Sequence, residues 1–137
     1  MTRAWGRRGG GGFTMIELLI VIVIIGILVA IAVPMYLTQK DKAKDAHARE
    51  GGRTIAIACM TFASEGDDTP TAAQVDKATL VAARAITAED WPPNYFSGED
   101  MKPTTSGARG DYSYRQLGGN DFELTVYLSK GEPFIVP

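Results

Sequence analysis

An uninterrupted apolar run near the N-terminus limits the fold of this chain more than any other feature. Leu18–Val33 holds sixteen consecutive apolar residues, counting Gly26. Together with Phe13–Glu17 the stretch reaches 21 positions, which make about 30 Å of α-helix, roughly the thickness of a bilayer core. The run is apolar on every side, whereas a helix of a soluble domain usually buries one face only. The sequence therefore predicts a membrane-spanning helix.

Glu17 is the one residue that does not fit a simple membrane anchor. An uncompensated charged side chain inside a bilayer costs about 3 kcal/mol or more, so we expect a partner for this carboxylate. A suitable partner is the α-amino group that would appear if the chain were cut before Phe13.

The residues around this point resemble a known export signal. Three arginines (Arg3, Arg7 and Arg8) precede Gly12, and Phe13-Thr14-Met15-Ile16-Glu17 then opens the apolar helix, which has Pro34 near its end. This pattern resembles the class III signal of type IV pilins and pseudopilins. The resemblance implies that a prepilin peptidase cuts between Gly12 and Phe13 and methylates the new N-terminal Phe13. It also implies that Glu17 neutralises the N-terminal amine of a neighbouring subunit during assembly.

Other interpretations of the apolar run remain. A conventional signal peptide with Ala30-Ile31-Ala32 as its cleavage site would release a soluble binding domain beginning at Val33. The apolar region of such a signal normally spans about 7–15 residues, and it carries no glutamate. An ordinary membrane anchor accounts for the length but leaves both Glu17 and the Gly12-Phe13 junction unexplained.

Composition limits what lies beyond the anchor. The chain has 137 residues, enough for one small domain beside the anchor. Three of its 14 Lys and Arg residues lie in Met1–Gly12, so the rest carries 11 basic side chains against 16 acidic ones. This acidic balance argues against nucleic-acid binding, which needs clustered basic residues. Cys59 is the only cysteine, so no disulfide can form within the chain, and many pilins differ from it in having one. We expect Cys59 to be a small buried residue.

The charges flanking the anchor do not fix its orientation. Arginines precede it, but Lys40, Lys42 and Lys44 follow it closely, and counting basic residues alone would place the C-terminal side in the cytoplasm. The family resemblance implies the opposite. We therefore expect a single-pass protein of the cytoplasmic membrane with its head outward, and an extracellular pilus fibre after assembly.

Three parts follow from this interpretation. Residues 1–12 are expected to be a cleaved leader, 13–37 a transmembrane and assembly helix, and 38–137 a globular head whose first part, 38–64, continues the same helix. Gly26 and Pro34 are the weak points of the helix, because Pro34 donates no backbone hydrogen bond. The resemblance implies that the helix melts between them in a filament.

Within the head, the helix is predicted to bury one stripe of residues. Apolar and small residues recur there at spacings of three and four: Ala48, Gly52, Ile55, Cys59 and Phe62. Gly51 and Gly52 indicate either a bend or a close-packing site. A second helix is predicted over 72–86, started by a Thr71–Gln74 capping box, and 94–110 reads as a long surface loop.

The C-terminal part changes to the alternation of β-strands. Strands are predicted over Asp111–Leu117, around Phe122–Leu128 and over Phe134–Val136, with turns at 118–120 and 129–132. One face of this antiparallel meander is apolar and needs a cover, which the helical stripe supplies. The fold class is therefore α+β, a long N-terminal helix packed against a small meander, as in the pilin fold.

No catalytic motif accompanies this fold. The sequence has no Ser-His-Asp arrangement, phosphate loop or metal-ligand spacing, and Asp67-Asp68 provide too few oxygens for calcium. We therefore predict a non-enzymatic structural subunit of a type IV pilus that uses no cofactor or metal. Its partners are copies of itself, the prepilin peptidase and the assembly machinery. A pseudopilin of a type II secretion system is the main alternative.

Overall fold

The computed structural model of the chain describes residues 12–66, 69–118 and 121–136. The described residues divide after Thr38 into two compact units. Most of the leader predicted over 1–12, the Asp67-Asp68 pair and the centre of the turn at 118–120 lie outside the described residues.

Helix α1 (Met15–Glu65) runs through both units. Its part in the second unit, from Gln39 onward, is the helix against which the head is built. Seven residues of this part are buried, at intervals of one to three residues: Ala48, Gly51, Gly52, Ile55, Ala56, Ala58 and Cys59. Phe62 packs against the same core from a partly buried position. The predicted stripe is therefore present, and Ile55 and Cys59 at its centre are fully buried.

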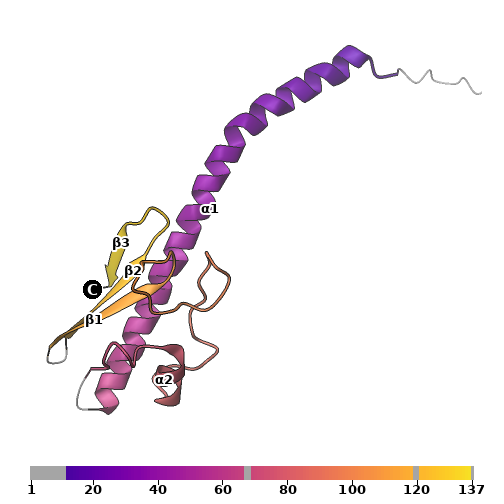
Figure 1. Cartoon of the computed structure of the whole chain (residues 1–137). Helices are drawn as coiled ribbons and strands as arrows, with labels where there is room; N and C mark the ends of the chain where they lie inside the picture. Colours follow the sequence, from indigo (N-terminus) through magenta and orange to yellow (C-terminus); the bar gives the residue numbers. More distant parts are fainter. Residues whose placement is uncertain (1–11, 67–68, 119–120, 137) are drawn as a thin grey trace, which may run out of the picture. The chain divides into compact units, whose positions relative to one another are not determined.

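A three-stranded antiparallel sheet packs against this stripe. Its strands β1 (Tyr112–Gly118), β2 (Asp121–Tyr127) and β3 (Pro133–Val136) pair in the order β1-β2-β3. Residues of one face lie opposite one another, Tyr112 with Val126 and Val126 with Phe134. Figure 1 shows the sheet along one side of α1, with α2 on the other side. The predicted α+β fold, a long helix covering a small meander, is confirmed.

The two adjacent glycines of α1 are close-packing sites rather than a bend, since α1 continues through them. A Cβ atom added at Gly52 would overlap Cγ2 of Val126 and would lie 3.3 Å from Cγ2 of Val136. One added at Gly51 would lie 2.5 Å from the sulfur of Met101 and 2.9 Å from Cβ of Pro92. The absence of side chains at these positions lets the sheet and the loop approach the helix backbone from two directions.

The second helix is much shorter than predicted, and α2 spans only Lys77–Ala82. The side-chain oxygen of Gln74 does accept hydrogen bonds from Thr71, both at 2.8 Å, but these bonds close a turn. The helix is capped by Asp76, the residue before its first turn, whose carboxylate accepts a bond of 2.7 Å from the backbone N–H of Thr79. This bond lowers the pKa of Asp76.

Helix α2 ends in a Schellman motif. Arg84 adopts a φ of 60° and donates its N–H to the carbonyl of Val81, while Ala85 donates to that of Leu80. The left-handed conformation at Arg84 explains why the periodicity that extends to Ile86 does not continue the helix.

The segment predicted as a surface loop is anchored in the core. Asn94 is buried, and its amide donates to the carbonyl of Arg109 and to the carboxylate of Asp111 while accepting bonds from the N–H groups of Phe96 and Ser97. The indole N–H of buried Trp91 donates to the carbonyl of Met101. Two separate points thus hold the loop against the head.

Candidate functional site

The candidate site is the start of α1, where Thr14 and Glu17 form a reciprocal pair. The Glu17 carboxylate accepts bonds from the Thr14 backbone N–H (2.9 Å) and the Thr14 hydroxyl (2.8 Å). In return, the Glu17 N–H donates to the Thr14 hydroxyl oxygen at 3.2 Å. This is a capping box, which satisfies N–H groups that the first turn of a helix would leave unbonded.

This capping box is not among the features predicted above. Its signature, Thr followed three residues later by Glu and an apolar run, is present at Thr14 and Glu17 and is recognisable from sequence. Glu17 therefore has a role within its own chain. Both bonds that it accepts end on the same oxygen, Oε2.

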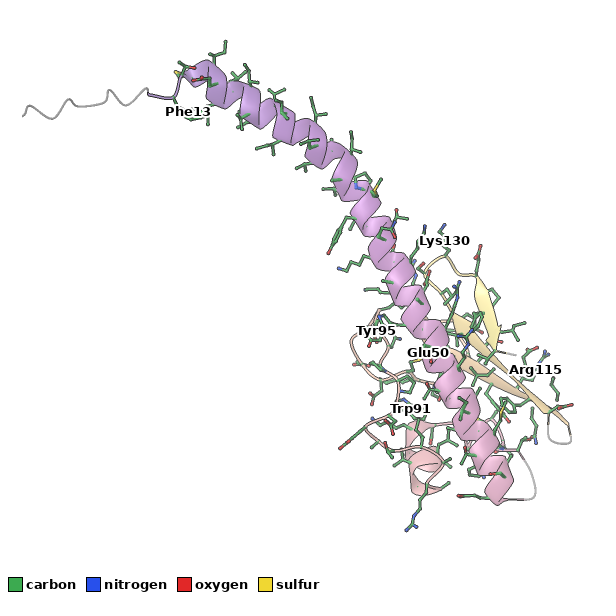
Figure 2. All side chains as sticks on the ribbon, turned by 180° about the vertical axis from the view of Figure 1, so that it is seen from behind. Phe13, Glu50, Trp91, Tyr95, Arg115 and Lys130 are labelled. Atoms are coloured by element: carbon green, nitrogen blue, oxygen red, sulfur yellow. The ribbon has the colours of Figure 1, made fainter. Side chains whose placement is uncertain are left out.

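The helix that follows exposes its apolar side chains on all sides. Phe13 is 82% exposed, and the large apolar side chains from Ile16 to Leu37 are between 44% and 67% exposed. Figure 2 shows these side chains projecting all around the helix after Phe13. Among the described residues, α1 is the one helix long and apolar enough to cross a membrane, with a mean hydropathy of 3.3 over an 18-residue window. Such a surface needs lipid or other apolar helices around it.

Gly26 and Pro34 both lie inside α1. Pro34 cannot donate a hydrogen bond to the carbonyl of Ala30, yet the helix continues past it. One turn later the Thr38 hydroxyl donates to the carbonyl of Pro34 at 3.0 Å, a bond that leaves the Ala30 carbonyl unchanged. A Cβ atom added at Gly26 would meet no neighbouring atom within 4 Å. In the single chain the segment between these residues is helical.

The head has few groups suited to catalysis. Among the described residues, no group of three or more His, Cys, Asp or Glu side chains is placed to hold a metal ion. His47 is exposed and stacks on Tyr95 with ring centroids 4.4 Å apart. Cys59 is fully buried, and this burial raises the pKa of its thiol to about 12, which keeps it protonated and unreactive at neutral pH.

Comparison with known proteins identifies the same N-terminal segment. The family model described as the prokaryotic N-terminal methylation motif matches residues 7–33. This range includes Gly12, Phe13 and Glu17, as well as the whole apolar run Leu18–Val33. No solved structure matches the chain significantly.

Three relatives share between 43% and 45% of the aligned residues. The type IV major pilin protein PilA of Myxococcus xanthus is 43% identical over 56 residues, 41% of this chain and 26% of that protein. The type IV narrow pilus major component PilA5 of Thermus thermophilus is 45% identical over 64 residues, 47% of this chain and 55% of that protein. The type II secretion system core protein G of Pseudomonas aeruginosa is 44% identical over 52 residues, 38% of this chain and 37% of that protein. The chain thus spans about a quarter to just over half the length of these relatives.

Proposed function

We propose that this chain is the structural subunit of a type IV pilus, because its N-terminal segment matches the prokaryotic N-terminal methylation motif and is similar to that of two type IV pilus components and a type II secretion core protein. Residues 1–12 are a leader, 13–37 anchor the subunit in the cytoplasmic membrane, and 38–137 form an outward-facing head. The prepilin peptidase cuts between Gly12 and Phe13 and methylates Phe13, and the assembly machinery then extrudes subunits into a helical fibre.

One observation carries this proposal, the apolar surface of α1 that is exposed on all sides from Ile16 to Leu37 and follows directly after the methylation motif's Gly12-Phe13 junction. An isolated subunit keeps this surface in lipid. In the fibre the helices of neighbouring copies cover it, so dispersion packing and charge neutralisation drive assembly, because leaving lipid for another helix gains little hydrophobic free energy.

Glu17 supplies the register of this assembly. Its Oε2 atom is bonded to Thr14 of the same chain, and the carboxylate as a whole retains a negative charge for the amine of Phe13 on a neighbouring copy. Burying the carboxylate without that amine is costly. The segment from Gly26 to Pro34 loses its helical structure when the helices pack in the fibre, which shortens the bonded part of α1.

The processing step is tested by the N-terminus of the purified native protein. The proposal predicts a chain that begins at methylated Phe13, as read by N-terminal sequencing and intact mass. A chain beginning at Met1 excludes processing, and one beginning at Val33 identifies the released soluble domain instead.

The assembly role is tested by Glu17→Ala and Glu17→Val. Both variants should be processed and retained in the membrane but depleted from fibres sheared off the cells. Glu17→Asp retains the charge and serves as the matched control. A normal amount of fibre from the Ala and Val variants would refute the pairing role.

The similarity to the secretion component of Pseudomonas aeruginosa supports a second candidate, a pseudopilin that forms a short periplasmic filament. Both candidates need the same processing and the same exposed helix. They differ in where the polymer lies, so long extracellular fibres built of this chain support the pilus, and polymer confined to the periplasm supports the pseudopilin.

A further inference from the structure

Three lysines lie close together at the start of the head helix. Lys40, Lys42 and Lys44 lie on α1 and form no ion pair with any carboxylate in the described residues. Lys44 instead lies over the ring of Phe96, 5.2 Å from its centroid. Two aspartates lie among them: Asp41 is exposed, and Asp45 accepts two hydrogen bonds from Ser129. The stretch therefore carries a small excess of basic side chains, three lysines against two aspartates.

A cavity of about 220 Å³ lies further along the same helix. It is formed by α1 on one side and by residues 89–93 and Tyr95 of the loop on the other. Figure 2 shows Trp91 and Tyr95 from the loop beside Glu50 on α1. Three acidic side chains line it, Glu50 from α1 and Glu89 and Asp90 from the facing segment.

Glu89 and Asp90 differ from the other acids of the loop. Glu99 pairs with Lys102 at 2.5 Å and Asp100 with Lys77 at 2.7 Å. Glu89 and Asp90 form no ion pair within the described residues, although Asp90 accepts a hydrogen bond from the hydroxyl of Thr87. The third acid of the cavity, Glu50, lies 3.5 Å from Arg53.

The lysines and the cavity lie on the same side of α1. Lys44 contacts Phe96 and His47 stacks on Tyr95, so both point toward the loop, and Lys40 is one turn before Lys44. Lys44 and Lys40 precede Glu50 by six and ten positions, which is roughly 9–15 Å along the helix axis. A second copy that is shifted by this amount along the axis would place its lysines over the cavity.

An open helical polymer needs this kind of arrangement. Its contacts are heterologous, so each subunit carries two different patches that complement each other, rather than one self-complementary patch. Unpaired charges of opposite sign on one side of the head, offset along the axis, meet this requirement. A lysine also fits the cavity chemically, since its stem packs on aromatic rings while its ammonium group meets carboxylates.

We propose that Lys40 and Lys44 of one copy dock into the cavity lined by Glu89, Asp90, Trp91 and Tyr95 of a second copy. The occupant of the cavity is thus the start of the head helix of a neighbouring subunit. This contact rests on the proposed filament, and it adds to the helix bundle a second, electrostatic contact that selects copies of the same chain.

Charge reversal tests the contact. Lys40→Glu with Lys44→Glu, and separately Glu89→Lys with Asp90→Lys, should each reduce the sheared fibre at least fivefold relative to the membrane pool. Combining all four changes should restore more than half of the wild-type yield. Arg109→Glu and Glu65→Lys reverse exposed charges outside the two patches and should leave the yield unchanged. The fluorescence of Trp91 in each purified variant checks that the head is folded.

Cross-linking between two copies provides an independent readout. Fibres are assembled from a mixture of two tagged chains, one carrying Lys44→Cys and the other Glu89→Cys, and are treated with a short bismaleimide. The native Cys59 is buried and does not compete. A mixed dimer carrying both tags is expected, and pairing Arg109→Cys with Glu89→Cys should give at least fivefold less.

The outcomes separate this contact from the proposed function. A wild-type chain that forms no fibre contradicts the proposed function itself. Wild-type fibres together with normal fibres from either reversed patch, or without the mixed dimer, overturn the contact while the pilin role stands.

Discussion

Asp45 on α1 holds Ser129 in the turn between β2 and β3 with both of its carboxylate oxygens. One oxygen accepts the backbone N–H of Ser129 and the other accepts its hydroxyl, each at 2.8 Å. The two residues are 84 positions apart in the sequence, and both are partly buried. This pair fixes the end of the sheet to the beginning of the head helix, beyond the last buried contact of the apolar stripe at Ala48.

Replacing Asp45 with Ala should destabilise the head by about 1–3 kcal/mol, because hydrogen bonds to charged groups contribute about 1.5–3 kcal/mol each and partial exposure reduces that value. Urea unfolding in detergent, followed by Trp91 fluorescence, measures the change. A chain beginning at Phe13 contains Trp91 as its only tryptophan. Asp41→Ala, one turn earlier on an exposed face, should change the midpoint little. Equal midpoints for both variants would contradict the role assigned to Asp45.

Gly52→Ala should also destabilise the head, by about 1–3 kcal/mol, through overpacking. Helix propensity alone would favour Ala by about 1 kcal/mol, so the sign of the change decides between the two effects. The added methyl group would overlap Val126, which is fully buried and cannot move aside freely. Gly26→Ala meets no neighbouring atom and should leave the unfolding midpoint of the head unchanged. A more stable Gly52→Ala head would show that the sheet can move away from the helix.

The elements whose apolar residues recur at a regular spacing were predictable from the sequence. The stripe through Ile55 and Cys59 repeats at helical spacing, and Leu124 and Val126 alternate as a strand does, so helix, meander and their shared core follow from local patterns. The capping box at Thr14 and Glu17 also has a local sequence signature, although the cost of a carboxylate in a membrane had indicated only an intermolecular role for Glu17.

Other features depend on contacts that no local pattern encodes. Arg84 ends α2 in a left-handed conformation usually reserved for glycine, so the apolar spacing of 72–86 overstated the helix. Asn94 anchors the loop because its side-chain amide donates hydrogen bonds to Arg109 and Asp111, which are distant in sequence. The bond between Asp45 and Ser129 joins two polar residues that the sequence alone gives no reason to pair.

Stability should fall in alkaline solution because of Cys59. Burial raises the pKa of its thiol from the usual 9.0 to about 12, so between these values the unfolded chain loses a proton that the folded chain keeps. Unfolding then becomes more favourable as the pH rises, by up to about 1.4 kcal/mol per pH unit for one proton. Burial also raises the pKa of Tyr112, which acts in the same direction.

The contribution of Cys59 is isolated by comparing the wild type with Cys59→Ala between pH 7 and pH 11. The wild type should lose stability faster than the variant above pH 9, and the difference between their unfolding free energies should be constant below pH 8. Parallel curves over the whole range would show that the thiol ionises equally in both states.

Thr14→Val separates two roles of Glu17, capping its own helix and pairing with the amine of a neighbouring copy. The substitution keeps the shape of the side chain but removes the hydroxyl that donates to Glu17 Oε2 and accepts the Glu17 N–H. The backbone N–H of Thr14 still reaches the carboxylate, so only part of the cap is lost, at a cost of about 0.5–1 kcal/mol. The fibre yield should therefore fall roughly two- to fivefold, since 1.4 kcal/mol corresponds to tenfold, and Thr14→Ser should restore it.

Glu17→Val should reduce the yield much further, because it removes the charge that meets the amine of the next copy as well as the cap. If sheared-fibre yields of Thr14→Val and Glu17→Val fall equally, the carboxylate serves mainly to start its own helix, and the pairing between subunits must come from another group.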